Sequence, residues 1–243
     1  MNFPFYIARR YLFSKKSHNA INVISMVSVC GVVVATIALV CALSVYNGFN
    51  DLVSTLFSTF DPELKITPRT GKVFDPMEKK FQSVKTMNSI AVWSEVLEDN
   101  ALVRYDNRQV VAVVKGVSDN FDKLASIDSV LIDGHFVLKD DVVNYAVPGV
   151  GLASALGVNA GYLSPMELYA PKRDGNVNLS NPATSFQISY AYVGGVFCIN
   201  QQVYDENYML VPLSLARELF KYDTEVSSIE LKLTPESDLF DVK

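Results

Sequence analysis

The chain has 243 residues, enough for one membrane segment and one folded unit of about 200 residues with a sizeable core. Its formal charge of −5 is unevenly distributed, because residues 1–46 contain Arg9, Arg10, Lys15 and Lys16 and no acid, which leaves 17 of the 21 bases with all 26 acids in the remainder. An acidic folded unit argues against nucleic acid as a partner, since phosphates call for a basic surface.

The N-terminal segment NFPFYIARRYLF has two interpretations. It can form a short helix with Asn2 as the cap and Pro4 in the first turn, whose bases face anionic lipid headgroups. It can equally be a basic flank without regular structure that only sets the membrane topology.

A run of 24 residues without charge extends from Val23 to Tyr46. As a helix it reaches about 36 Å, more than the ~30 Å hydrocarbon core of a bilayer. The bases precede this run and Asp51 and Asp61 follow it, so the positive-inside bias places residues 1–22 in the cytoplasm. We therefore expect a transmembrane helix over residues 23–46, with residues 47–243 beyond the inner face of the membrane.

A retained anchor is favoured over a cleaved export signal. The run exceeds the 7 to 15 apolar residues of a signal peptide, and Ala42-Leu43-Ser44 resembles a cleavage site only loosely. Beyond the run, apolar residues recur at helical spacing, which predicts that the helix continues as a stalk to about residue 60, where Asp61-Pro62 ends it. These residues are Phe49, Leu52, Val53, Leu56, Phe57 and Phe60.

Residues 61–243 are predicted to form an α+β domain, possibly with two subdomains. ELKITP and VSSIELKLT alternate like strands, MEKKFQSVKTM has helical spacing with Phe81 and Val84 on its buried side, and YMLVPLSLARELF is typical of a strand that runs into a helix. The clearest signal is ALVRYDNRQVVAVVKGV, in which two β-branched runs meet at Asp106-Asn107 and predict a hairpin. An antiparallel or mixed sheet fits better than a doubly wound one.

The segment from 171 to 185, PKRDGNVNLSNPATS, is the one long loop signal. A loop of this length either contacts a partner or forms a plain hairpin tip. Both interpretations remain open on the sequence alone.

Catalytic and cofactor chemistry is not predicted. His18 and His135 are the only histidines and lie on opposite sides of the expected membrane, and no Walker motif is present. GVGLAS resembles the start of a dinucleotide fingerprint, but Gly157 and Gly161 cut the following helix short, so a capped helix LASALG is expected instead. The acid pairs Glu98-Asp99 and Asp140-Asp141 are interpreted as solvated residues beside turns. We predict a protein that is not an enzyme and binds no metal or cofactor.

Several segments, in order, resemble the membrane subunits of lipoprotein-releasing ABC transporters, the LolC/LolE type within the MacB/FtsX-like permease group. They are ARRYL, LSVYNGF, VVKGV, GLASALGVNAG, VGGVF and YMLVPLSLARELF, and together they cover essentially the whole chain.

The resemblance implies a MacB-like periplasmic core domain between the first two of four transmembrane helices, with ATP-Mg bound by a separate cytoplasmic ABC ATPase subunit. By this pattern the chain stops before the second transmembrane helix. Implied partners are that ATPase, a second permease subunit in a homo- or heterodimer, a lipoprotein cargo, a periplasmic lipoprotein chaperone and membrane lipid. The first helix would transmit movement from the ATPase to the periplasmic domains.

The resemblance also suggests where contacts lie. Candidate residues for contact with the lipoprotein or the second subunit are Asn47, Gly48, Phe49, Leu52, Leu56, Phe57 and Phe60. A chaperone-contacting loop would correspond to residues 171–185, with Lys172 and Arg173 as the basic residues to test.

Two rivals to lipoprotein release remain open. One is a permease of the same architecture with another cargo, or one that transmits force as FtsX does. The other is a membrane-anchored extracytoplasmic binding or sensor domain that is complete in itself.

Overall fold

The computed structural model describes residues 3–12, 20–58, 62–173 and 185–234. The chain divides into two compact units, Met1–Thr55 and Leu56–Lys243. Each unit is described by itself below.

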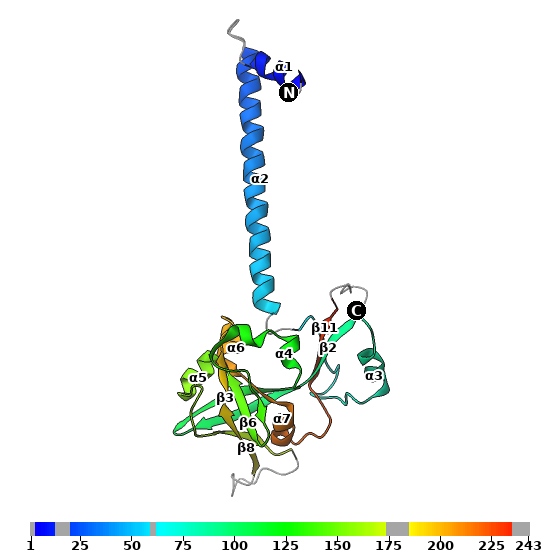
Figure 1. Cartoon of the computed structure of the whole chain (residues 1–243), viewed down its shortest axis with the longest axis vertical. Coiled ribbons are helices and arrows are strands. Elements are labelled where there is room, and N and C mark those ends of the chain that lie inside the picture. Colours follow the sequence, from blue (N-terminus) through cyan, green and yellow to red (C-terminus); the bar gives the residue numbers. More distant parts are fainter. Residues whose placement is uncertain (1–2, 13–19, 59–61, 174–184, 235–243) are drawn as a thin grey trace. The chain divides into compact units, whose positions relative to one another are not determined.

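The first unit is helical. Helix α1 spans Phe3–Leu12, and α2 is one helix of 39 residues, Ala20–Ser58, without a break at Asn47-Gly48-Phe49 (Figure 1). The stretch Val23–Asn50 is long and apolar enough to cross a membrane. Two hydroxyls within it return hydrogen bonds to the preceding turn, Ser28 to the Ile24 carbonyl at 2.9 Å and Thr36 to the Val32 carbonyl at 2.7 Å, so neither is left without an acceptor in an apolar medium.

The second unit is built on a mixed sheet, as predicted for an α+β fold. The sheet order is β1-β11-β2-β3-β10-β6-β8-β7, with β5 attached to β6, and β4 pairs with β9 in a separate ribbon. The strands are β1 Leu64–Ile66, β2 Ile90–Tyr105, β3 Arg108–Val117, β4 Leu131–Gly134, β5 Lys139–Asp140, β6 Val143–Pro148, β7 Met166–Pro171, β8 Phe186–Val193, β9 Gly195–Phe197, β10 Tyr208–Pro212 and β11 Ser228–Leu233. The short helices are α3 Lys79–Lys85, α4 Phe121–Leu124, η1 Ile127–Val130, α5 Val150–Leu156, α6 Gln202–Asn207 and α7 Leu213–Phe220.

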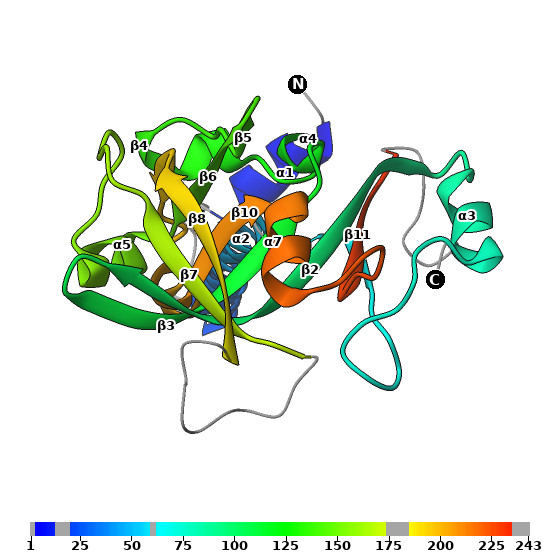
Figure 2. The same ribbon diagram turned by 90° about the horizontal axis from the view of Figure 1, so that it is seen from below.

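The sheet closes on itself through β2, which has 16 residues. The first part of β2 pairs with β11, whereas Leu102–Arg104 pair with Tyr169–Glu167 of β7. Strands β2, β3, β10, β6, β8 and β7 therefore form a ring (Figure 2). The ring's interior holds one core, and a second core lies where α4 and η1 pack on other residues of β2, β3, β6 and β10.

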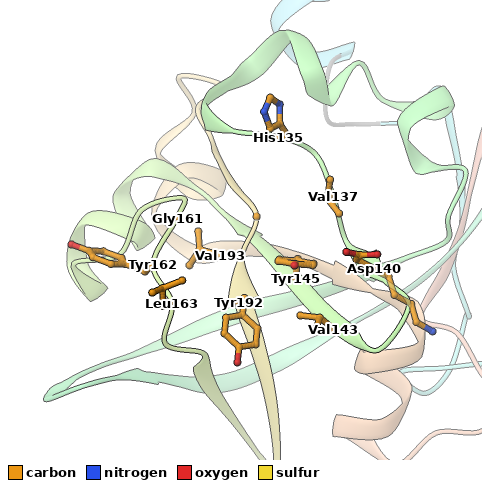
Figure 3. A pocket seen from close by; sticks show the side chains of 12 residues that line it. His135, Val137, Asp140, Val143, Tyr145, Gly161, Tyr162, Leu163, Tyr192 and Val193 are labelled. Atoms are coloured by element: carbon orange, nitrogen blue, oxygen red, sulfur yellow. The ribbon is translucent and has the colours of Figure 1, made fainter.

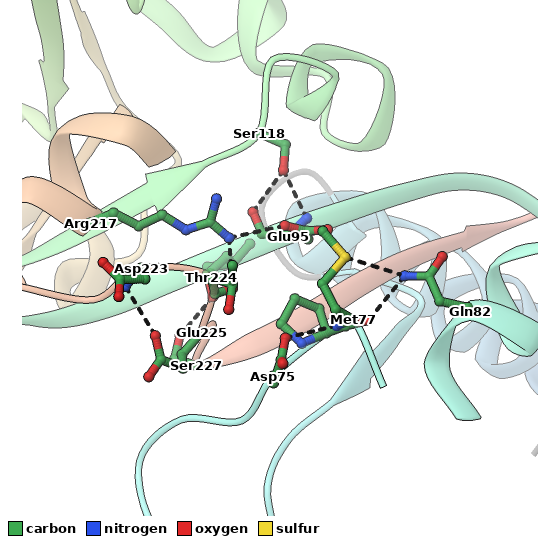
Figure 4. Close-up of polar contacts among 12 residues, drawn as sticks. Asp75, Met77, Gln82, Glu95, Ser118, Arg217, Asp223, Thr224, Glu225 and Ser227 are labelled. Carbon is green, nitrogen blue, oxygen red and sulfur yellow. Dashed lines mark hydrogen bonds and ion pairs between the residues drawn. The ribbon is translucent and has the colours of Figure 1, made fainter. Parts of the chain in front are cut away.

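Helix α7 belongs to the core of the ring. Leu215, Ala216 and Leu219 are buried, and the helix approaches β3 so closely that a Cβ on Gly116 would lie 2.3 Å from the Cβ of Ala216. A glycine is needed at 116 for this approach. Figure 4 shows the polar tie on the same helix, in which the Arg217 guanidinium donates to Glu95 at 3.2 Å and to the Thr224 carbonyl at 2.9 Å.

The predicted hairpin at Asp106-Asn107 is confirmed. Strands β2 and β3 pair from Val96↔Val117 to Tyr105↔Arg108, which leaves a two-residue turn in which Asp106 has φ 52°. Aspartate tolerates this left-handed conformation better than most residues.

The part of the sheet outside the ring has its own small core. Trp93, Val226, Ile229 and Leu231 are buried there, and Phe81 and Val84 of α3 pack against them. Phe81 and Val84 therefore form the inward side of α3, as predicted, and both are partly buried.

The expected position of Glu98 and Asp99 beside a turn is wrong. Both lie inside β2, are about one-quarter exposed and form ion pairs, Glu98 with Lys65 at 3.3 Å and Asp99 with Lys72 at 3.0 Å. Because lysines lie beside them, these two acids are accommodated inside a strand, although the neighbouring residues in the sequence are typical of a loop.

Candidate functional site

Of the seven residues proposed to contact cargo or a second subunit, the structure describes the side chains of Asn47, Gly48 and Phe49. All three are exposed on α2, with Phe49 at 64%. A Cβ placed on Gly48 would meet no atom within 4 Å. This part of α2 is thus accessible to a neighbouring molecule. Lipid or another helix can pack equally well against the exposed phenylalanine.

Leu52, Leu56 and Phe57 lie within α2, but their side chains, like all of Phe60, are outside the described residues. Their proposed contact with lipoprotein or with a partner subunit stays a prediction.

The loop proposed to contact a chaperone connects β7 to β8. The two strands pair antiparallel up to Pro171↔Phe186, and the Lys172 amide donates to the Ser185 carbonyl at 2.9 Å. The segment is therefore a hairpin connection. Its central residues 174–184 lie outside the described part, and its role in binding stays a prediction.

The two basic residues at the base of this hairpin differ in their surroundings. The Arg173 guanidinium lies over the Tyr222 ring, 3.9 Å from its centroid, and donates to the Lys221 carbonyl at 3.4 Å. It holds the hairpin against the end of α7. Both residues are exposed, and Arg173 is in addition held by these contacts.

A polar cluster lies on the outer surface of the ring where β2 pairs with β7. Arg104 Nε donates to Glu167 Oε2 at 2.7 Å, and the Tyr169 hydroxyl donates to the same oxygen at 2.6 Å. The Tyr169 bond, with help from Arg104, holds the pKa of Glu167 below its ordinary value, and it raises the pKa of Tyr169. The cluster clamps the strands that close the ring.

A cleft with a volume of about 710 Å³ lies beside the short pairing of β6 and β8. Figure 3 shows Tyr145 and Val143 from β6, Tyr192 from β8, and Tyr162 and Leu163 from the loop before β7 around it. The Tyr145 and Tyr192 rings are 6.3 Å apart. His135, Lys139 and Asp140 also line it, so the cleft combines aromatic side chains with a few polar groups.

The GVGLAS segment forms the capped helix that was expected. Helix α5 ends at Leu156, and Gly157 adopts φ 72° in the left-handed region. A Cβ on Gly149 would lie 2.5 Å from the Asp205 carbonyl oxygen, and one on Gly151 would lie 2.8 Å from Glu206. These glycines therefore serve close packing on α6.

One buried charge cluster was missed by sequence reasoning. Lys115 Nζ on β3 lies 2.9 Å from Glu230 Oε1 on β11, with side-chain exposures of 4% and 0%. Lys65 lies 3.6 Å from the same oxygen. Burial lowers the pKa of Lys65, but Glu98 and Glu230 outweigh it and raise that pKa overall. No motif marks these residues, because they are brought together only by strand pairing across β2.

The family described as the MacB-like periplasmic core domain matches residues 25–243, which include the whole of the described sheet and most of α2. The chain belongs to the MacB-like periplasmic core domain family. The predicted resemblance and fold class are thereby confirmed.

Two relatives of this MacB-like chain are known by name. It is 26% identical over 246 residues to the lipoprotein-releasing system transmembrane protein LolE of Haemophilus influenzae, with 96% of this chain and 55% of LolE covered. It is 25% identical over 232 residues to the lipoprotein-releasing system transmembrane protein LolC of Neisseria meningitidis serogroup B, with 94% of this chain and 54% of LolC covered. The chain spans about half the length of these relatives.

A solved structure supports the fold alone. The extracellular domain of the noncanonical ABC-type transporter YknZ from Gram-positive bacteria aligns with a TM-score of 0.50 and 12% identity, over 71% of this chain and 80% of that one. Among the residues that the structure describes, no group of three or more His, Cys, Asp or Glu side chains is placed to hold a metal ion.

Proposed function

We propose that this chain is part of an ABC permease subunit that extracts lipoproteins from the bacterial inner membrane and passes them to a periplasmic chaperone. The observation that carries the proposal is the similarity to LolE, which extends over 96% of the chain and includes both the apolar helix and the sheet domain. The subunit has no catalytic role in this scheme, because a separate cytoplasmic ATPase binds ATP-Mg.

The long helix supports a mechanical role. A helix of 39 residues reaches about 58 Å at ~1.5 Å per residue, which exceeds the ~30 Å hydrocarbon core. With residues 1–22 in the cytoplasm, its last turns stand in the periplasm as a stiff lever from the ATPase side to the sheet domain. Gly48 and Phe49 offer the second permease subunit an open surface at the level where the helix leaves the lipid.

Depletion of the complete gene product in its own bacterium tests this function. Membranes are separated on a sucrose gradient, and the distribution of outer-membrane lipoproteins is measured by immunoblotting. The proposal predicts that they accumulate in the inner membrane within a few generations. Normal sorting would remove the lipoprotein assignment and favour a permease with another cargo or a force-transmitting role.

A further inference from the structure

Strand β8 has one paired edge and one that is open for most of its length. It pairs with β7 from Phe186 to Ala191 but with β6 only at Tyr192 and Val193. Among the residues that the structure describes, no strand lies beside Phe186–Tyr190 on the side away from β7.

The register decides which main-chain groups face the open edge. The Lys172 amide bonds to the Ser185 carbonyl, and Pro171 stands opposite Phe186, so Lys172 and Ser185 are a directly hydrogen-bonded pair. Such pairs alternate along an antiparallel ladder. The N–H and C=O groups of Phe186, Ile188 and Tyr190 therefore point away from β7.

The side chains on this edge lack the usual protection against pairing. Phe186, Ile188 and Tyr190 are 37%, 37% and 53% exposed, and the strand FQISYAYV carries no charge. Open edges are normally blunted by lysine, proline or a bulge. An apolar, uncharged edge of about 16 Å is suited to receive another strand.

The open edge leads to the 710 Å³ cleft. Tyr192 and Val193, the next residues of β8, line it together with Tyr145, Tyr162 and Leu163. Leu163 is 91% exposed and forms one of its apolar walls. A strand added to Phe186–Tyr190 would place one terminal side chain in this cleft.

We propose that the open edge of β8, together with the cleft at its end, binds an extended, uncharged segment of another protein by strand addition, with a bulky apolar side chain of that segment in the cleft. Main-chain bonds to Phe186, Ile188 and Tyr190 supply the affinity, and the cleft supplies the preference for an aromatic residue. A second copy of this chain is a poor occupant, because a contact of five residues a side falls far short of the roughly 20–30 residues a side of a stable interface.

The test uses the full chain in detergent micelles and a fluorescein-labelled peptide of alternating Thr and Val that ends in Phe. Binding is followed by fluorescence anisotropy. Two further peptides carry N-methyl groups on every second residue, one in each frame. Strand addition predicts saturable binding that one methylated frame abolishes and the other leaves within twofold, because only alternate residues face β8.

Variants locate the site. Ile188→Pro removes an N–H that faces the open edge while keeping every β7 bond, and it is expected to weaken binding at least tenfold. If its melting curve departs from wild type, Ile188→Lys, which leaves the backbone intact, replaces it with the same expectation. Leu163→Lys is expected to weaken binding of the Phe peptide and not of a Thr-ended one. Val111→Thr, on an exposed part of β3, is the matched control and is expected to have no effect.

Three results would overturn the proposal. They are the absence of saturable binding, equal sensitivity to both methylated frames, and unchanged binding by a folded Ile188 variant. Sedimentation in which wild type dimerises and the Ile188 variant is monomeric would also overturn it, since the edge would then be an interface between copies.

Discussion

Removal of the Lys115 ammonium is predicted to destabilise the sheet domain strongly. The substitution Lys115→Met keeps most of the apolar stem but removes the ammonium, which lies over the Phe121 ring. It leaves Glu230, whose side chain is 0% exposed, without its nearest cation. Breaking a buried ion pair typically costs about 3–5 kcal/mol, because the remaining charge stays desolvated.

The structure sets where in this range the loss falls. Lys65 Nζ remains 3.6 Å from Glu230 and compensates in part, so a loss of about 3 kcal/mol in the free energy of unfolding is expected. Lys65→Met removes the more distant and 36% exposed partner, and about 1 kcal/mol is expected. The double variant Lys115→Met/Glu230→Leu replaces the pair with apolar groups and should regain most of the loss.

Trp93 is the assay. It is the chain's only tryptophan, it is 8% exposed, and it precedes Ser94, the residue paired with Glu230. Its fluorescence during urea unfolding in detergent reports the sheet domain, since the long helix contains no tryptophan. A loss below about 1 kcal/mol for Lys115→Met, or a double variant less stable than the single one, would refute the argument that Glu230 is a buried charge held by Lys115.

Three further predictions follow from the fold. Gly116→Ala should lower the free energy of unfolding in urea by about 1–3 kcal/mol, because its Cβ would lie 2.3 Å from the Cβ of Ala216. Adding Ala216→Gly to the same chain should restore part of this loss, and an unaltered urea midpoint for Gly116→Ala would mean that α7 does not pack on β3 in this way. The pKa of Lys65 is raised in the folded protein, so its contribution to stability is complete below the unfolded pKa of about 10.5 and is lost as pH rises through the folded pKa. The urea midpoint of wild type should therefore fall more steeply above pH 10 than that of Lys65→Met. Parallel curves for the two proteins would contradict this prediction. Arg173→Glu should lower the melting temperature by a few degrees through loss of its contact with Tyr222, whereas Lys172→Glu should leave the melting temperature unchanged. If only Lys172→Glu weakens a chaperone pull-down, the hairpin base is a binding surface. If neither variant weakens it, the proposed chaperone contact is removed.

Local signals in the sequence predicted local structure well. The β2–β3 hairpin was predictable because β-branched runs flank a pair that tolerates positive φ, and the end of α5 because Gly157 is suited to the left-handed cap. The apolar helix followed from an uncharged run longer than a bilayer core.

Closure of the ring could not be predicted in the same way. The pairing of Leu102–Arg104 with Tyr169–Glu167 joins segments more than 60 residues apart, and nothing in either segment specifies the other. The buried Lys115–Glu230 pair was missed for the same reason, since each residue reads as an exposed charge until β3 and β11 flank β2. The open edge of β8 exists because β6 pairs with β8 only at Tyr145 and Ala146 and the chain before Tyr145 does not lie along β8, which the composition of β8 does not reveal.

The proposed contact sites stay predictions. The sequence located a loop at 171–185, and only the structure shows that it connects two paired strands and that Arg173 lies over Tyr222. The stripe from Leu52 to Phe60 remains a prediction from spacing.

Lipoprotein release is the central claim, and reconstitution tests it most directly. The complete gene product, its ATPase and a second permease subunit are placed in liposomes with a radiolabelled triacylated lipoprotein, and lipoprotein transferred to soluble chaperone is measured. The account predicts transfer that requires ATP, chaperone and this subunit together. Chaperone-bound lipoprotein at the same level without this subunit, or ATP hydrolysis by the assembled complex with no transfer, would contradict it.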